Sequence, residues 1–177
     1  DPIDRSPDLV LKDFLDGWIN EEQATKIYGV IFNKELTSVD SDATLLNREN
    51  IRKKRLQEAK GGQKEYKSGN KEAVVYEHSP SIKVGKYDGE LMYQCASSHT
   101  IFGSVKKNWK ELVPFIERNI DKEYLDDRVL DIGIRENQKQ FQVREYISPI
   151  NGTQLEVELS QEGSKIEYDS KPSHYGV

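Results

Sequence analysis

The sequence predicts an α+β protein, with a small N-terminal helical unit, a linker and an antiparallel β domain. Three observations predict this arrangement. Helix-capping signals recur near the N-terminus, and a glycine-punctuated polar stretch follows them. Beyond that stretch the apolar residues change from helical spacing to alternation. We therefore expect a helical unit at 1–60, a linker at 61–72, a β domain at 73–163 and a tail at 164–177.

The first predicted helix starts at a strong capping signal. Ser6 is placed as the N-cap, Pro7 at the first helical position and Asp8 in the first turn. Gly17 can end this helix, as glycine does beyond a helix C-terminus. The expected apolar stripe, at i, i+3, i+4 and i+7, consists of Leu11, Phe14, Leu15 and Trp18.

The second predicted helix begins with a capping box, because Asn20 is followed three residues later by Gln23. Its apolar face is expected from Ala24, Ile27 and Tyr28. Gly29 would end it, and residues 30–32 then fit a strand. After a polar connection, the composition favours a charged helix over residues 43–60, whose apolar face is thin.

The β domain is predicted from alternation and turn residues. Asp88-Gly89 is a strong hairpin signal, and a second turn is expected at 148–152. Residues 108–114 could form a helical turn or an extended loop, and 115–131 fit an irregular, charged excursion. The expected strands cover 73–76, 81–85, 91–95, 141–147 and 155–159.

Composition argues against several classes of protein. A formal net charge of -5 disfavours a general nucleic-acid binder, which needs a concentrated basic face. The basic run Arg52–Arg55 is a local exception that we interpret as a solvated helix face. No apolar run approaches the roughly 20 residues of a membrane helix. The single cysteine, Cys95, excludes an internal disulfide framework and fits a reducing compartment, so a cytoplasmic location is expected.

A first resemblance concerns residues 1–31. The residues that carry it are Asp1-Pro2, Arg5, Pro7, Val10, Asp13, Asp16-Gly17, Ala24 and Tyr28-Gly29-Val30. This ordered pattern resembles the C-terminal end of the hydantoinase B/oxoprolinase family, which includes a large subunit of acetone/acetophenone-type ATP-dependent carboxylases. The resemblance implies larger hydantoinase A-like and hydantoinase B-like subunits as partners, with ATP and a divalent metal bound in those subunits.

A second resemblance concerns the β domain. It is carried by Cys95, Asn108-Trp109-Lys110, Val143-Arg144-Glu145-Tyr146, Pro149, Gly152-Thr153 and Leu155-Glu156-Val157-Glu158. These residues resemble the acetone carboxylase gamma subunit. The resemblance implies a zinc ribbon, in which two hairpin turns supply paired cysteines because four soft ligands must meet in a tetrahedron.

The ligand positions of that ribbon are degenerate in this sequence. They correspond to Cys95, Ser98, Ser148 and Asn151, so one cysteine remains among four. A neutral hydroxyl or amide offers neither thiolate charge nor sulfur softness, and a nitrogen from His99 would not complete a site. We therefore expect a metal-free ribbon without bound zinc. A partially occupied or intersubunit zinc site is the alternative.

No residue is predicted to be catalytic. We interpret Cys95 as a buried strand residue rather than a nucleophile, and His78 and His174 as solvated side chains of a loop and the tail. No phosphate-binding Gly-x-x-x-x-Gly-Lys motif is present, so no ATP site is expected in this chain. A cluster of acids could ligate a divalent cation, although capping and exposed helix positions explain it better: Asp1, Asp4, Asp8, Asp13 and Asp16.

The leading functional hypothesis combines the two resemblances. They imply an accessory subunit, or C-terminal portion, of a hetero-oligomeric carboxylase that activates a ketone by phosphorylation to an enol phosphate. Two alternatives stay open: part of an ATP-dependent hydantoinase or oxoprolinase that opens a cyclic amide, and a non-enzymatic scaffold or binding protein. Trp18 and Trp109 could serve an interface or a core equally well. No membrane partner is expected.

Overall fold

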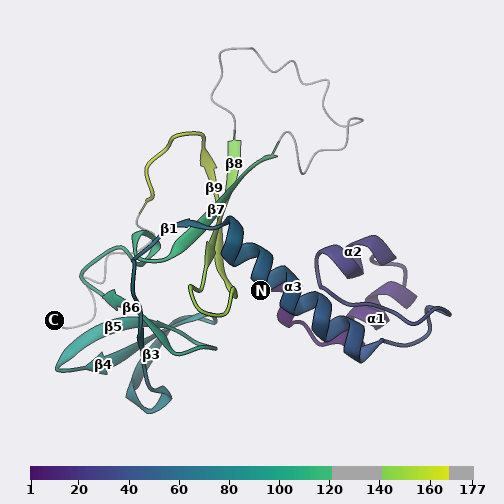
Figure 1. The fold of residues 1–177 in the computed structure, drawn as a ribbon, viewed down its shortest axis with the longest axis horizontal. Coiled ribbons are helices and arrows are strands. Elements are labelled where there is room, and N and C mark those ends of the chain that lie inside the picture. The colour runs from purple at the N-terminus through teal and green to yellow at the C-terminus, as the bar shows by residue number, and fades with distance from the viewer. Residues whose placement is uncertain (121–140, 168–177) are drawn as a thin grey trace. The chain divides into compact units, whose positions relative to one another are not determined.

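The computed structural model describes residues 1–120 and 141–167. It confirms the α+β class, with N-terminal helices followed by antiparallel sheets (Figure 1). The chain forms two compact units, Asp1–Gln57 and Glu58–Val177. Among the described residues, no helix combines the length and the apolar character that crossing a membrane requires.

The helices of the first unit enclose a small apolar core. The elements are η1 (Pro2–Asp4), α1 (Pro7–Leu15), α2 (Glu21–Lys26) and α3 (Ser41–Glu58), whose last residue belongs to the second unit. The buried core residues are Val10, Ala24, Val30 and Phe32. The capping box of α2 is confirmed, because Asn20 Oδ1 accepts from the Gln23 backbone N–H at 2.8 Å while Gln23 Oε1 accepts from that of Asn20 at 2.9 Å.

The apolar stripe predicted for α1 is only partly right. Leu11 and Phe14 pack against the core, but Val10 is the residue that α1 buries fully. Leu15 and Trp18 are 61% and 79% exposed. The reason is that α1 ends at Leu15 and Gly17 takes a φ of 78°, so the helical spacing that would align Trp18 stops before reaching it.

The strand predicted at residues 30–32 is wrong. Phe32 makes one isolated antiparallel bridge with Val39. The Ile31 backbone N–H instead donates to Thr44 Oγ1 at 2.9 Å. A side chain of α3 therefore satisfies the backbone group that a strand neighbour would otherwise have paired.

The charged helix is confirmed over Ser41–Glu58, and its thin apolar face buries only Thr44. Arginines attach it to the rest of its unit. Arg48 donates to the carbonyl oxygens of Tyr28 at 3.2 Å and of Arg5 at 2.7 Å. Arg52 pairs with Asp4, as Arg55 pairs with Asp1. Two arginines of the basic run therefore form ion pairs within the unit, so the run is not only a solvated helix face. Their guanidinium groups attach the helix in place of apolar side chains.

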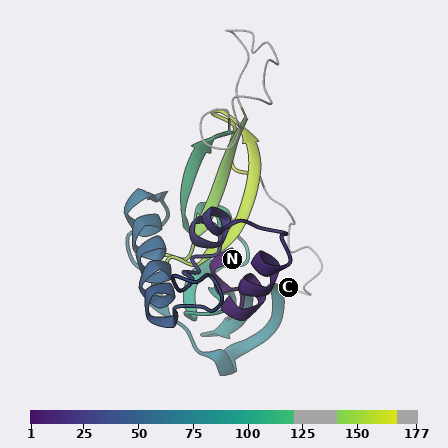
Figure 2. The same cartoon turned by 90° about the vertical axis from the view of Figure 1, so that its right-hand side faces the viewer.

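The second unit contains two antiparallel sheets. The strands are β1 (Lys60–Gly61), β2 (Lys67–Ser68), β3 (Val74–Ser79), β4 (Ile82–Tyr87), β5 (Glu90–Cys95), β6 (Thr100–Ser104), β7 (Pro114–Asn119), β8 (Phe141–Ile147) and β9 (Gln154–Gln161). One sheet has the order β2-β6-β5-β4-β3 and the other β1-β7-β8-β9. Strands β7, β8 and β9 run side by side in Figure 2. The segment predicted as a linker, 61–72, thus includes β2 and parts of β1 and of the 3-10 helix η2 (Lys71–Ala73).

The Asp88-Gly89 hairpin between β4 and β5 is confirmed. Both residues have positive φ, 49° and 85°, which is the geometry of a type I′ turn. Residues 108–114 include a 3-10 helix, η3 (Trp109–Glu111). The irregular excursion predicted from residue 115 is wrong for 115–119, which belong to β7, while its residues 121–131 lie outside the described part of the chain.

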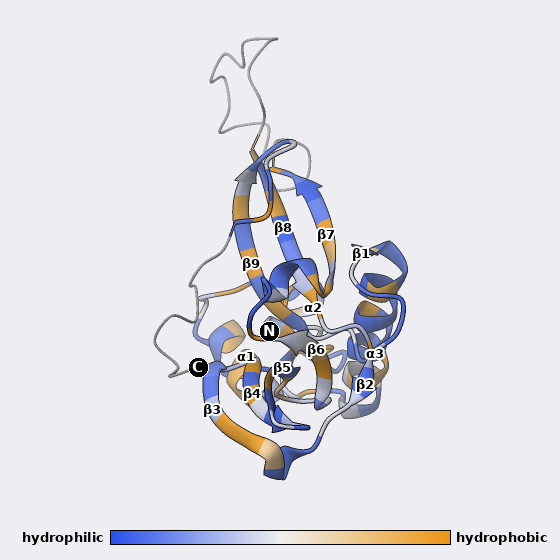
Figure 3. Cartoon of the chain, turned by 90° about the vertical axis from the view of Figure 1, so that its left-hand side faces the viewer, coloured by the Kyte–Doolittle hydropathy of each residue, from blue (hydrophilic) through white to orange (hydrophobic). Residues whose placement is uncertain are grey.

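Both sheets contribute to one hydrophobic core. Its buried members are Ile82, Val84, Tyr93, Cys95, Phe102, Val105, Trp109, Val113, Tyr146 and Leu155. Trp109 is 3% exposed, and its ring centroid lies 5.4 Å from that of Tyr146. Trp109 is therefore a core residue of the second unit, whereas Trp18 is exposed. Figure 3 shows apolar and polar residues alternating along β9.

Candidate functional site

Two turns of the second unit have equivalent backbone geometry. The first spans Cys95 to His99 at the end of β5, and the second spans Ser148 to Gly152 between β8 and β9. In each, the fifth residue donates its N–H to the carbonyl oxygen of the first: His99 to Cys95 at 3.0 Å, and Gly152 to Ser148 at 3.0 Å. The fifth residue also has positive φ in both turns, 55° at His99 and 67° at Gly152. We call them the first and second knuckle.

The side chains of the two knuckles meet. Ser98 Oγ lies 3.4 Å from Ser148 Oγ, and Asn151 Nδ2 donates to Ser97 Oγ at 3.0 Å. Ser97 Oγ in turn lies 3.2 Å from Cys95 Sγ. The four positions named from the sequence, Cys95, Ser98, Ser148 and Asn151, are therefore brought into one polar cluster, with Ser97 connecting two of them. This cluster joins the five-stranded sheet to the β8–β9 hairpin.

The spacing of the cluster is close to that of a metal site, but its chemistry is not. Two ligands placed about 2.3 Å from a tetrahedral zinc ion lie about 3.8 Å apart, which is near the separation of the Ser98 and Ser148 hydroxyl oxygens. The donors, however, are one thiol, hydroxyls and an amide. Within residues 1–120 and 141–167, no three or more His, Cys, Asp or Glu side chains gather where they could hold a metal ion. The residues present do not fit zinc.

Hydroxyl groups surround the only thiol of the chain. Burial raises the pKa of Cys95, but hydrogen bonds from the hydroxyls of Ser148, Ser97 and Ser98 and from the Ser98 backbone N–H outweigh it, so the pKa is lowered overall. Cys95 is fully buried. A thiolate-stabilising environment therefore exists in a place that reagents in solution do not reach, which agrees with the interpretation of Cys95 as a buried strand residue.

A buried ion-pair network occupies the inner face of β8 and β9. Lys110 Nζ lies 2.7 Å from Glu156 and 2.9 Å from Glu158, while Arg144 pairs with Glu158 at 3.2 Å and with Glu117 at 3.0 Å. The side chains of Lys110 and Arg144 are only 1% and 2% exposed. Two buried cations are thus compensated by three carboxylates, as buried charge requires.

Tyr146 completes this network. Its hydroxyl donates to Glu158 Oε2 at 3.0 Å. Burial raises the pKa of Tyr146, and the Glu158 carboxylate raises it further against the opposing effect of Arg144, so that the hydroxyl stays protonated and remains a donor. The Lys110 ammonium also lies 5.2 Å from the centre of the Tyr146 ring, within cation–π range.

Sequence reasoning missed this network, although a signal for it was present. Gln142, Arg144 and Tyr146 alternate with more apolar neighbours on β8, and the polar set is the one that faces inward. Arg144 lies directly opposite Glu158 on β9 and Glu117 on β7. Matching these opposite charges across neighbouring strands would have predicted that the side chains are buried as ion pairs.

The remaining candidates are dispersed. His78 lies in β3 with its ring 5.3 Å from that of Tyr93, so its interpretation as a solvated loop residue is wrong, and His174 lies outside the described residues. Four of the N-terminal acids each contact a different basic side chain: Asp1 pairs with Arg55, Asp4 with Arg52, Asp13 with Arg5 and Asp16 with Lys12.

Comparison with known proteins identifies the second unit. The family described as acetone carboxylase gamma subunit matches residues 71–173, which is more than half of the chain and includes both knuckles and the ion-pair network. The match does not reach residues 1–31, so their resemblance to hydantoinase B stays a prediction. A search of curated proteins finds no match. On the strength of the family match, the chain belongs to the acetone carboxylase gamma subunit family.

Proposed function

We propose that this chain is an accessory part of a multi-subunit ATP-dependent carboxylase acting on a ketone-type substrate. It contributes subunit interfaces rather than catalytic groups. The observation that carries the proposal is the match of residues 71–173 to the gamma subunit family, since a gamma subunit implies partner carboxylase subunits.

The site supports a structural role for the second unit. Its knuckles supply hydrogen bonds between two sheets, and its buried cations are already paired with carboxylates. Cys95, the one thiol of the cluster, is enclosed in the core. Large apolar side chains nevertheless stay exposed, including Trp18, Ile150 and Leu159, and such residues are commonly covered in assemblies.

The first unit extends the proposal. Its residues 1–31 resemble the C-terminal end of hydantoinase B, so one chain would join that end to a gamma-like domain. Hydantoinase A-like and hydantoinase B-like subunits would then be the partners, and ATP and the divalent metal would bind to them. Support for this part comes from the ordered residue pattern alone.

Two measurements on material purified from the native source test the proposal. Native mass spectrometry is expected to find the chain in a complex with two larger subunits, and recovery of only a stable monomer would contradict it. The complex is expected to consume ATP when a ketone and bicarbonate are both present. ATP consumption with a cyclic amide instead would replace carboxylation by ring opening, while no ATP consumption with either would favour a scaffold.

A further inference from the structure

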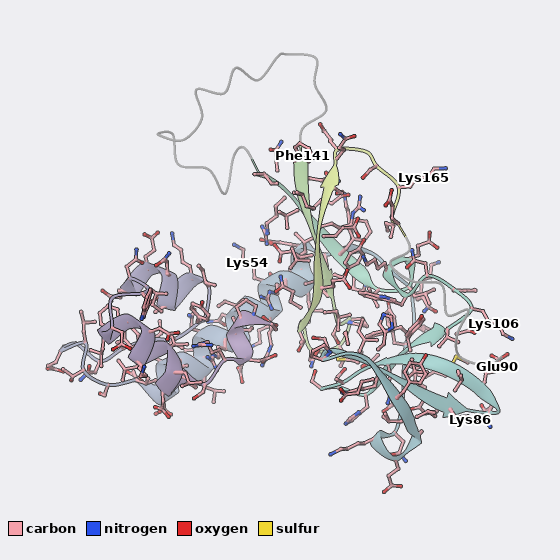
Figure 4. All side chains as sticks on the ribbon, turned by 180° about the vertical axis from the view of Figure 1, so that it is seen from behind. Lys54, Lys86, Glu90, Lys106, Phe141 and Lys165 are labelled. Atoms are coloured by element: carbon pink, nitrogen blue, oxygen red, sulfur yellow. The ribbon has the colours of Figure 1, made fainter. Side chains whose placement is uncertain are left out.

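The second knuckle contains the only Asn-Gly pair of the sequence, Asn151-Gly152. An asparagine followed by glycine is prone to deamidation, because glycine has no Cβ and its backbone nitrogen can approach the side-chain carbonyl carbon closely. Figure 4 labels the first residues of the two strands that lead into the knuckles, Glu90 of β5 and Phe141 of β8. The pair therefore lies in one of the two turns that join the sheets.

The folded turn restrains each group that this reaction needs. Asn151 Nδ2 donates to Ser97 Oγ at 3.0 Å, and Asn151 Oδ1 accepts from the Thr153 backbone N–H at 3.3 Å. The Gly152 N–H donates to the Ser148 carbonyl oxygen at 3.0 Å, and Gly152 is buried. The attacking nitrogen must lose its proton and come close to Cγ of the asparagine. These hydrogen bonds must therefore break before the reaction can begin.

We propose that Asn151 is a site of spontaneous deamidation whose rate is set by opening of the second knuckle. In the opened turn the Gly152 backbone nitrogen loses its proton and attacks Cγ of Asn151. A C–N bond forms, and the side-chain nitrogen leaves as ammonia. Water then opens the resulting succinimide at either carbonyl group, which gives aspartate or isoaspartate. Water is the only co-reactant that the step requires.

The reaction would remove the direct hydrogen bond from the second knuckle to Ser97. An ionised aspartate has no hydrogen-bond donor, and a serine hydroxyl has a single hydrogen. Ser97 Oγ now accepts from Asn151, so its own hydrogen can point toward Cys95 Sγ at 3.2 Å. With a carboxylate at position 151, that hydrogen would turn to the carboxylate instead. Cys95 would then lose one of the hydrogen bonds that lower its pKa.

Peptide mapping of the full chain by mass spectrometry tests this inference. The chain is incubated at neutral pH, once folded and once in urea, and the deamidated fraction is followed at each asparagine. In urea, Asn151 is expected to react faster than Asn70, which is followed by lysine rather than glycine. In the folded chain, Asn151 is expected to react at least about tenfold more slowly than in urea, because the reaction requires local opening.

The variant Ser97→Ala removes the acceptor of the Asn151 amide. Deamidation of Asn151 in this folded variant is expected to be about fivefold faster than in the wild type, the effect of losing one neutral hydrogen bond. The rate in urea should not change, because residues 97 and 151 are distant in the sequence. The matched control is Ser68→Ala, the same substitution at an exposed serine of β2, and it should change neither rate. Circular dichroism confirms that both variants are folded.

A further variant separates knuckle opening from global unfolding. Glu158→Gln removes a charge from the ion-pair network but no hydrogen bond of either knuckle. The folded rate at Asn151 should therefore stay within about twofold of the wild type. A rate that rises in proportion to the lost stability would show that global unfolding admits the reaction, and would overturn the inference.

Three other results would also overturn it: equal rates at Asn151 in the folded chain and in urea, no faster reaction at Asn151 than at Asn70 in urea, or no acceleration in folded Ser97→Ala. The variant Asn151→Asp reproduces one product and is expected to raise the pKa of Cys95, measured by the ultraviolet absorbance of the thiolate. An unchanged pKa would contradict the predicted effect on the cluster. None of these results concerns assembly with other subunits, so the proposed function is tested separately.

Discussion

The knuckle cluster and the ion-pair network bury polar groups in the same unit by different means. The cluster consists of a thiol, hydroxyls and an amide, whereas the network consists of full charges held by β7, β8, β9 and η3. A neutral hydrogen bond contributes about 1 kcal/mol net. A buried charge that loses its partner costs about 3–5 kcal/mol. Single substitutions in the cluster should therefore lower the free energy of unfolding only slightly. Substitutions that remove a charge from the network should lower it strongly.

The same contrast concerns the structural zinc ion that a complete ligand set would bind at the knuckles. A structural zinc ion would cross-link the knuckles with a free energy far above that of single hydrogen bonds. In this chain the knuckle backbones are alike in turn geometry, but the ligands are neutral. We infer that the shared core and the nearby ion pairs make a metal cross-link dispensable.

The largest effect is expected from rebuilding the ligand set. The variant Ser98→Cys/Ser148→Cys/Asn151→Cys, together with Cys95, would place four thiols at the knuckles. It should bind about one equivalent of zinc and melt at a much higher temperature, because structural zinc contributes about 10–16 kcal/mol in small domains. Elemental analysis and thermal unfolding with and without a chelator measure this. The single variant Ser98→Cys is the control, and a folded triple variant that binds no zinc would show that the turns are not metal knuckles.

The next largest effect is expected in the network. Glu158→Gln keeps the shape of the side chain but removes the charge that Lys110, Arg144 and Tyr146 share. Unfolding free energy should fall by about 3 kcal/mol, measured in urea in a Trp18→Phe background so that Trp109 alone reports on the second unit. Glu156→Gln, whose side chain is 35% exposed, is the matched control and should cost about 1 kcal/mol or less. Equal effects would contradict the proposed difference between the two acids.

Lowering the pH should destabilise the same network, because the Glu117 carboxylate becomes protonated. Burial raises the pKa of this carboxyl, but hydrogen bonds and charges from Lys60 and Arg144 outweigh it, so the folded-state pKa is lowered. The resulting stability is present above the unfolded pKa of about 4.3 and is lost as the pH falls through the folded value. Urea midpoints between pH 7 and 3 measure this. In Glu117→Gln the urea midpoint should fall less steeply towards pH 3, and in Lys60→Met the fall should be partly reduced. The same steepness as in the wild type for both variants would exclude Glu117 as the source of the acid sensitivity.

The smallest effect is expected in the knuckle cluster. Ser148→Ala removes one hydroxyl that lies beside Ser98 and Cys95. The Ser98 hydroxyl nevertheless keeps its hydrogen bond with Thr100 Oγ1 at 2.8 Å. Unfolding free energy should fall by about 1 kcal/mol. The exposed Ser68→Ala is the control and should be neutral. A loss as large as that of Glu158→Gln would mean that the cluster behaves like the charged network.

The features that sequence predicted well depend on local chemistry. The Asn20–Gln23 capping box and the Asp88-Gly89 turn are formed by neighbouring residues, so their patterns are sufficient to predict them. The antiparallel class followed from alternation. The positions of Cys95 and Ser98 in a turn facing Ser148 followed from family resemblance and not from spacing.

What sequence did not predict depends on partners distant in the chain. Strand β7 has the sequence Pro-Phe-Ile-Glu-Arg-Asn, which is too charged to suggest a central strand, but Glu117 pairs with Arg144 and Arg118 pairs with Glu145 on the neighbouring strand. Residues 30–32 looked like a strand, but Thr44 satisfies the Ile31 backbone N–H instead. Apolar periodicity cannot detect burial that ion pairs or side-chain hydrogen bonds make possible.

The most direct test of the central claim, that neutral hydrogen bonds rather than a metal close the two knuckles, is the zinc content of the unmodified chain purified without added metal or chelator. We predict well under one-tenth of an equivalent, with a melting temperature that a chelator leaves unchanged. One full equivalent of zinc, lost on chelation together with the folded structure, would contradict it.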